Sequence, residues 1–331
     1  MSNAEHGCTY SSSAGKCSER AMTGGLFCFW HAPDVDKTGP GVREKLEKRA
    51  MTGIPMDGFI LRGANLENLN LVNAKGVPHH LTNTDLSRAN LHNAHLYKVD
   101  LSGSSLLKAD LSGANLHRAS LMGCNLLGVN LKACRLEHVD WGDEICQATL
   151  AESVIAQEIQ DANSVEKAAL LYEEAEEVAR NIRKSCERQG VFDIAGDFFH
   201  REMQFRRYQL PRFSLRRFVS KGVDIVSGYG EKPERIVLFS AFFIFICSLF
   251  YFGFGINGGS DVIQLNLSLP WTANVYAWLE CLYFSVVTFT TLGYGDLSPL
   301  GPSRFFAAME AFIGSFSLAL FVVVFVKKMT R

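Results

Sequence analysis

The sequence predicts a multi-domain membrane protein whose N-terminal half is polar and repetitive and whose C-terminal part is α-helical. Three observations predict this fold class. Two long apolar stretches follow residue 235, leucine recurs at nearly every fifth position from residue 61 to residue 136, and three cysteines and two histidines precede residue 32. The formal net charge of −1 over 331 residues fits a polar portion that offsets a membrane portion.

The two apolar stretches are each long enough to cross a bilayer. Residues 236–256 carry no charge, and at a rise of about 1.5 Å per residue they cover roughly 30 Å of hydrocarbon. Residues 303–327 contain a second stretch of similar length, whose apolar run is interrupted only by Glu310. We therefore expect two membrane-spanning helices.

A shorter apolar segment, residues 278–290, lies between the two stretches and predicts a re-entrant pore helix within residues 275–297. It runs into the sequence Thr290, Thr291, Leu292, Gly293, Tyr294, Gly295 and Asp296. A dehydrated potassium ion needs rings of oxygen atoms, which successive backbone carbonyls of four chains can supply. Gly293 and Gly295 permit the backbone conformations that aim these carbonyls at one axis. The segment predicts a potassium-selective pore in a homotetramer.

Basic residues predict the orientation in the membrane. They precede the first stretch and follow the second, as Arg212, Arg216, Arg217, Lys221, Lys232, Arg235, Lys327, Lys328 and Arg331. In the intervening segment, residues 257–304, Arg304 is the only basic residue. We therefore expect both termini in the cytoplasm and Asp296 at the outer mouth of the filter. Residues 1–25 lack the apolar run of a signal peptide, and the short loops suit a bacterial inner (plasma) membrane.

Over residues 236–331 the chain resembles the potassium channel superfamily, specifically its two-helix members. The resemblance implies a selectivity filter for K⁺ made of Thr291, Leu292, Gly293, Tyr294 and Gly295. It also implies that Asp296, Tyr283 and Phe284 support the filter. Leu292 replaces the more usual valine, and no arginine-rich spanning helix is present, which excludes voltage sensing by such a helix.

Two residues of the second stretch, Glu310 and Gly314, lie one helical turn apart. A carboxyl in apolar surroundings needs a partner or a proton, so we expect Glu310 to accept a hydrogen bond from a hydroxyl such as Thr288 or Ser285, or from a backbone amide, and to support the filter. The alternative is a lipid-facing position near the outer interface. Family resemblance implies a gating hinge at Gly314, whereas close helix packing would explain the same small residue.

The N-terminal half repeats with a period of five residues, which neither a helix nor a strand has. The series is Leu61, Leu66, Leu71, Gly76, Leu81, Leu86, Leu91, Leu96, Leu101, Leu106, Leu111, Leu116, Leu121, Leu126, Leu131, Leu136 and Trp141. The residue two positions earlier is usually small, and the residue between them is commonly Asn or Asp.

This pattern resembles the pentapeptide-repeat family, which implies a right-handed, four-sided β-helix, here within residues 41–145. With twenty residues in each coil, about four coils are expected at a spacing of about 4.8 Å, with Trp141 as a plug. Gly76 and Pro78 break the pattern without changing its register. Eight basic and six acidic residues between positions 59 and 141 argue against DNA mimicry, so we expect a rigid interaction or spacer module and no nucleic-acid partner.

Residues 1–40 contain a candidate metal site with the spacing C-x8-C-x10-C-x2-H. Its residues are Cys8, Cys17, Cys28 and His31. The segment is too small and polar to build a core alone, and a tetrahedral Zn²⁺ knuckle would explain how it folds. His6 competes as the fourth ligand, thiols scattered in a disordered tail are the alternative, and a cytoplasmic location argues against disulfides.

The segments that join the repeats to the membrane are predicted to be helical. Residues 146–210 have the spacing of an α-helical hairpin, and residues 211–235 that of an amphipathic juxtamembrane linker in contact with membrane lipids. An ordinary basic flank that only sets topology is the alternative for the linker. Residues 228–230 spell Gly-Tyr-Gly but lack a preceding threonine and pore helix, so we interpret them as a turn.

The sequence predicts an ion channel and not an enzyme. No Ser-His-Asp pattern, phosphate loop or paired carboxylate site stands out. We expect passive potassium conduction, with a cytoplasmic repeat domain that regulates or assembles the channel through a partner or ligand that the sequence does not identify. The alternative is a non-conducting, membrane-tethered scaffold, which a test of flux in Gly293→Ala would separate from a channel.

Overall fold

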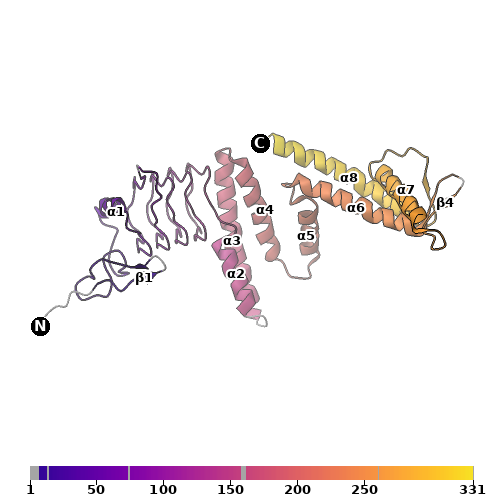
Figure 1. Ribbon diagram of the computed structural model, residues 1–331. Helices are drawn as coiled ribbons and strands as arrows, with labels where there is room; N and C mark the ends of the chain where they lie inside the picture. Colours follow the sequence, from indigo (N-terminus) through magenta and orange to yellow (C-terminus); the bar gives the residue numbers. More distant parts are fainter. Residues whose placement is uncertain (1–6, 13–14, 74, 158–161, 260, 331) are drawn as a thin grey trace. The chain divides into compact units, whose positions relative to one another are not determined.

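The computed structural model describes residues 7–12, 15–73, 75–157, 162–259 and 261–330 (Figure 1). The chain divides into two compact units, Met1–Arg212 and Phe213–Arg331. Each unit has a hydrophobic core of its own, and the larger core is built mainly from the leucines of the repeats.

The first unit begins with a small hairpin and a helix. Strand β1 (Ser11–Ser12) pairs antiparallel with β2 (Gly15–Lys16), and helix α1 (Val42–Met51) follows. Sequence analysis did not predict α1 at the start of the repeat region. Leu46 of α1 is fully buried, and the Glu47 carboxylate accepts a hydrogen bond from the amide of Asn70 at 2.8 Å. The helix therefore covers the edge of the first coil (Figure 1).

Residues 59–141 wind into the predicted coils. From His80 onward, single parallel bridges join residues that are twenty positions apart, up to the bridge between Ser120 and Asp140. The leucines of the five-residue series are at most 4% exposed. Amide-to-carbonyl hydrogen bonds between coils satisfy the backbone, as from Leu86 to Ser105 at 2.8 Å. The predicted pentapeptide-repeat fold is confirmed.

The first coil differs from the prediction. Ile60 bridges to Asp85 and Asn70 to His95, so these partners are 25 residues apart and not twenty. Gly76, predicted at an inward position, is exposed. One five-residue unit around Gly76 is thus added to this coil, and its described residues form no bridge to a neighbouring coil. Pro78 in it has no amide hydrogen for a ladder bond. The expectation of equal twenty-residue coils was wrong here.

Three helices close the far end of the repeats (Figure 1). They are α2 (Cys146–Gln157), α3 (Ala162–Arg188) and α4 (Phe192–Tyr208). The Asn181 side chain of α3 donates to the carbonyl of Val129 at 2.7 Å, and Phe198 of α4 packs edge-on against Trp141 at 5.5 Å. Helix side chains therefore satisfy the open edge of the last coil, and Trp141 alone is not the plug.

The second unit holds the apolar helices. It contains α5 (Leu215–Ser227), α6 (Pro233–Phe254), α7 (Trp271–Phe289) and α8 (Ser303–Met329). By length and composition α6 and α8 are candidate membrane spans, and α7 contacts both of them. Strands β4 (Val262–Ile263), β3 (Ile256–Asn257) and β5 (Ser298–Pro299) form an antiparallel sheet in that order. The sheet joins the segment after α6 to the segment before α8.

Candidate ion pathway and metal centre

The predicted filter begins directly after α7. That helix ends at Phe289, and the amide of Thr291 still bonds back to the carbonyl of Thr288 at 3.1 Å. From Thr291 onward, alternate residues have a positive φ, which is 58° at Thr291, 54° at Gly293 and 81° at Gly295. Alternation between left-handed and right-handed conformations turns successive carbonyls toward the same side of the strand. The positive φ values at alternate residues are consistent with the predicted carbonyl-lined pore.

Around the predicted filter, the side chains of residues 292 and 294 are exposed, whereas two aromatic side chains of α7 make contacts behind them. Leu292 is 58% exposed and Tyr294 is 67% exposed in a single chain. Behind them, the Tyr283 hydroxyl donates to the Asp296 carboxylate at 2.9 Å, which ties α7 to the segment after the filter. Phe284 is buried and packs edge-on against a tyrosine of α6 at 4.9 Å. Tyr283 thus contacts the segment after the predicted filter, whereas Phe284 packs against α6, and support of the filter by these two residues stays a prediction.

Glu310 of α8 is fully buried in a polar cluster with Tyr251 of α6 and Ser285 of α7. The Ser285 hydroxyl donates to one carboxylate oxygen and the Tyr251 hydroxyl to the other, both at 2.5 Å. Ser285 was one of the expected donors, whereas among the described residues Thr288 does not donate to Glu310. A lipid-facing position for Glu310 is excluded. Sequence reasoning missed Tyr251, whose hydroxyl within an apolar span was the available signal.

Gly314 lies one turn beyond Glu310 and faces the end of α7. A Cβ atom at Gly314 would overlap the carbonyl oxygen of Phe289. The α8 backbone therefore packs directly on the last turn of α7, which explains a glycine here without a hinge. The hinge itself stays a prediction.

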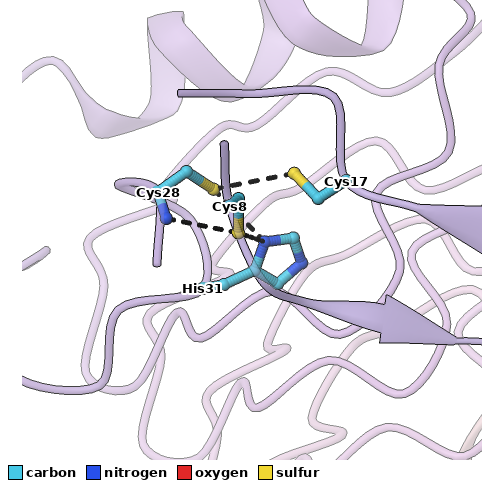
Figure 2. Close-up of side chains that lie close together, drawn as sticks. All are labelled: Cys8, Cys17, Cys28 and His31. Carbon is cyan, nitrogen blue, oxygen red and sulfur yellow. Dashed lines mark hydrogen bonds between the residues drawn. The ribbon is translucent and has the colours of Figure 1, made fainter. Parts of the chain in front are cut away.

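The four predicted metal ligands converge at the start of the first unit (Figure 2). Their donor atoms all lie within 4.8 Å of one another. The sulfurs of Cys17 and Cys28 are 3.8 Å apart, and His31 Nδ1 is 3.2 Å from the Cys28 sulfur and 3.6 Å from the Cys8 sulfur. With zinc–sulfur bonds of about 2.3 Å, a tetrahedral site needs sulfurs about 3.8 Å apart. His6 lies outside the described residues.

The other side of the histidine ring fixes this cluster to the repeats. His31 Nε2 lies 2.9 Å from the carbonyl oxygen of Asp57, which leaves Nδ1 to face the cysteines. The Asp57 carboxylate accepts hydrogen bonds from Tyr10 at 2.8 Å, Thr82 at 2.6 Å and Asn83 at 2.8 Å. Three cysteines and one histidine in this arrangement fit a closed structural zinc site, because no position remains for a substrate.

Comparisons with known families agree with both halves of this description. Residues 235–331 match the ion channel family. Residues 80–106 and 105–137 match pentapeptide repeats, in eight copies. No curated protein matches the chain significantly.

Solved structures of pentapeptide repeat proteins are similar to the repeats. HetL, involved in heterocyst differentiation regulation in the cyanobacterium Nostoc sp. strain PCC 7120, is 32% identical over 26% of this chain, with a TM-score of 0.24. This chain spans 38% of HetL. A second pentapeptide repeat protein from Nostoc PCC 7120 is 35% identical over 28% of this chain and 72% of its own length, with a TM-score of 0.25. A third, from Cyanothece 51142, is 33% identical over 27% of this chain and 61% of its own length, with a TM-score of 0.20.

Proposed function

We propose that this chain, which belongs to the pentapeptide-repeat family and carries an ion-channel segment at residues 235–331, forms a homotetrameric potassium channel. The alternating positive φ values of residues 291, 293 and 295, directly after α7, support this proposal most. The strand they form is exposed in one chain, and irregular backbone at membrane depth needs protein or water around it. Four chains around one axis meet that need.

Selectivity for potassium follows from the oxygens of this strand. Carbonyl rings from Thr291 to Gly295 replace the hydration shell of the ion, and the Thr291 hydroxyl adds a further ring. The channel conducts passively in a cell (plasma) membrane with both termini in the cytoplasm. There the repeat unit acts as a rigid regulatory or assembly module.

Potassium flux into vesicles that contain the purified protein tests the channel. Gly293→Ala is expected to abolish the flux, because a left-handed alanine costs about 1–2 kcal/mol in each of four subunits. Gly253→Ala is the matched control, since Gly253 is a helical glycine of α6 whose added Cβ meets no described atom within 4 Å. Sodium flux as fast as potassium flux would contradict selectivity. A folded tetramer without flux would favour the scaffold.

We further propose that Cys8, Cys17, Cys28 and His31 hold one structural Zn²⁺. The metal content of the purified chain tests this, with one zinc per chain expected. Cys17→Ser should lose the metal and Cys146→Ser should keep it, because Cys146 is not among the four clustered ligands. Equal zinc content in both variants, or none in the parent protein, would contradict the site.

A further inference from the structure

Helix α3 carries an exposed row of four charged side chains, which we call the charge stripe. Its members are Glu173, Glu177, Lys184 and Arg188. At about 100° per residue, the four positions fall within an arc of about 60° around the helix. Among the residues that the structure describes, none of the four forms an ion pair within the chain. The charge stripe is therefore an unpartnered face of α3.

Like charges are neighbours within the charge stripe. The two acids are four residues apart, and so are the two bases. Like charges at this spacing destabilise a helix, whereas opposite charges stabilise it. Elsewhere on α3 the same spacing joins opposite charges, between Arg180 and Glu176 and between Arg183 and Glu187. The charge stripe thus contains a local repulsion that a facing surface of opposite charge would relieve.

The helix macrodipole explains only part of this pattern. Lys184 and Arg188 lie near the C-terminal end of α3, where the dipole favours basic side chains. Glu173 and Glu177, however, are about three and four turns beyond the first residue of the helix, and the dipole acts within the first turn. Two adjacent, unpaired acids so far inside a helix indicate a partner outside the chain.

The charge stripe is complementary to itself. Glu173 and Arg188 are equally far from the midpoint between residues 180 and 181, and so are Glu177 and Lys184. A second α3 that lies antiparallel and is centred on the same midpoint therefore places each acid opposite a base. A parallel α3 in register would place like charges opposite each other, which is destabilising. A two-fold contact between identical chains requires a self-complementary surface of this kind.

We propose that α3 of one subunit pairs antiparallel with α3 of a second subunit of the same channel through the charge stripe. This inference rests on the proposed function in one respect, which is that the tetramer holds copies of the chain together. An exposed ion pair alone contributes little, but connection through a common pore gives the second copy a high effective concentration. The four cytoplasmic units are then grouped as two pairs.

A zero-length carbodiimide cross-link tests the pairing in the full chain. The reagent joins a carboxylate to an amine in contact with it, so we expect a bond between Glu177 and Lys184. Within one helix these residues are about 10 Å apart along the axis, which is too far for a direct bond. Channels assembled from isotopically labelled and unlabelled chains should give cross-linked peptides of mixed label. Glu177→Gln should lose the cross-link, and Glu166→Gln, at another exposed acid of α3, should keep it.

Charge-reversed variants test the complementarity. Glu173→Lys with Glu177→Lys makes the stripe wholly basic, and Lys184→Glu with Arg188→Glu makes it wholly acidic. Neither variant alone should give a cross-link between positions 177 and 184. Co-expression of the two should restore it, because basic and acidic stripes then face each other, and the variant with all four changes should also show it. Absence of the cross-link from both the mixture and the variant with four changes would overturn the pairing.

The mass of the native assembly separates this inference from the channel proposal. We expect cross-linked pairs inside assemblies of four chains. Tetramers without the cross-link would overturn the pairing and leave the channel standing. Cross-linked pairs in assemblies of only two chains would overturn the tetramer and leave the contact between stripes standing. Cross-links that join separate tetramers would overturn the pairing within one channel.

Discussion

Individual backbone conformations determine the stability of the repeats. In most five-residue units the residue two positions after the leucine has a positive φ, between 52° at Asn83 and 72° at Gly113. Glycine occupies many of these positions, and Asn68 and Asn93 suit others, because asparagine tolerates the left-handed region. Ala133 adopts the same conformation with φ of 58° and has neither advantage.

We expect Ala133→Gly to stabilise the last coil by about 0.5–1 kcal/mol, because relief of left-handed strain outweighs the added entropy of the unfolded chain. Gly123→Ala is the reciprocal control. Its new Cβ meets no described atom within 4 Å, so it adds backbone strain alone and should destabilise by a similar amount. Hydrogen exchange of the amides in residues 116–140 measures both changes. A slower exchange in Gly123→Ala would contradict the argument.

The polar cluster of Tyr251, Ser285 and Glu310 gives a second prediction at this scale. Tyr251→Phe leaves one oxygen of a buried carboxyl without its donor, which should lower the stability of the proposed tetramer by about 1–3 kcal/mol. Tyr276→Phe, on an exposed part of α7, should have no effect. The temperature at which the tetramer dissociates measures the difference. Glu310→Gln with unchanged stability and conduction would show that the cluster is passive.

Packing between elements explains why glycine follows glutamate by one turn in α8. Glu310 contacts Ser285 and Gly314 contacts Phe289, so two contacts four residues apart on α8 match two contacts four residues apart on α7. Residues at this spacing lie on one face of a helix. The arrangement fixes the register of α8 against α7, the helix that precedes the predicted filter.

Gly314→Ala should therefore weaken the tetramer by about 1–3 kcal/mol, because the added methyl group forces α8 away from the Phe289 carbonyl. Gly253→Ala in α6 should be neutral or slightly stabilising, since alanine favours a helix. Thermal dissociation of the tetramer compares them. A Gly314→Ala tetramer that is fully stable but rarely opens would instead support the predicted hinge.

The turns of the β-helix give a pH dependence. Asp85, Asp100 and Asp110 accept hydrogen bonds from the amides two residues further on, at Ser87, Ser102 and Ser112. Burial raises the pKa of these carboxyls, but hydrogen bonds from the serine amides and hydroxyls, together with other partners, lower each pKa below its ordinary value. The stabilisation that these ionised carboxylates give to the folded state is fully present above their unfolded-state pKa of about 4. It is lost as the pH falls through their lower pKa values in the folded state.

Replacing all three aspartates with asparagine should make the repeats less sensitive to acid below about pH 4. Asparagine keeps the acceptor oxygen, as Asn90 does for the amide of His92 at 3.1 Å, but does not titrate. Circular dichroism during acid titration follows the change. A reciprocal variant, Asn90→Asp with Asn115→Asp, should become more sensitive, and an identical acid profile for all three proteins would contradict this role.

The sequence predicted the repeats well because their main pattern is local. A period of five places every leucine inward, and the frequent Asn or Asp before it is explained by its hydrogen bond to the amide two residues on. The 25-residue first coil could not be predicted, because insertion of a whole unit around Gly76 leaves the period unchanged. Helix α1 was missed as well, because its mostly polar sequence gives little hydrophobic signal.

At the scale of the whole molecule, the candidate sites differ in how many of their residues are close together in the sequence. The predicted filter is one short segment, so the positive φ of Gly293 and Gly295 could be predicted from the sequence. The clustering of Cys8, Cys17, Cys28 and His31 could also be predicted by type and spacing, but the attachment of this cluster to Asp57 depends on the fold of the repeats. The partner of Glu310 in α6 is 59 residues away, and no local pattern specifies such a pairing.

Each of the two units contains every contact described for its own site. The candidate metal ligands and the capped repeats lie within residues 1–212. The predicted filter, the polar cluster around Glu310, the sheet and the hydrogen bonds of α5 lie within residues 213–331. Domains with separate cores can fold alone. The chain can therefore be divided at residue 212 without cutting either site.

Separate expression of residues 1–212 and 213–331 tests this division. We expect the C-terminal fragment to form a tetramer with the potassium-to-sodium flux ratio of the full chain, because all groups around its filter are retained. The N-terminal fragment should keep its zinc and unfold cooperatively, and chelation should lower its melting temperature. Any effect of the repeats on open probability would be missing from the C-terminal fragment alone. Loss of ion selectivity in that fragment, with the tetramer intact, would show that the filter depends on the cytoplasmic unit.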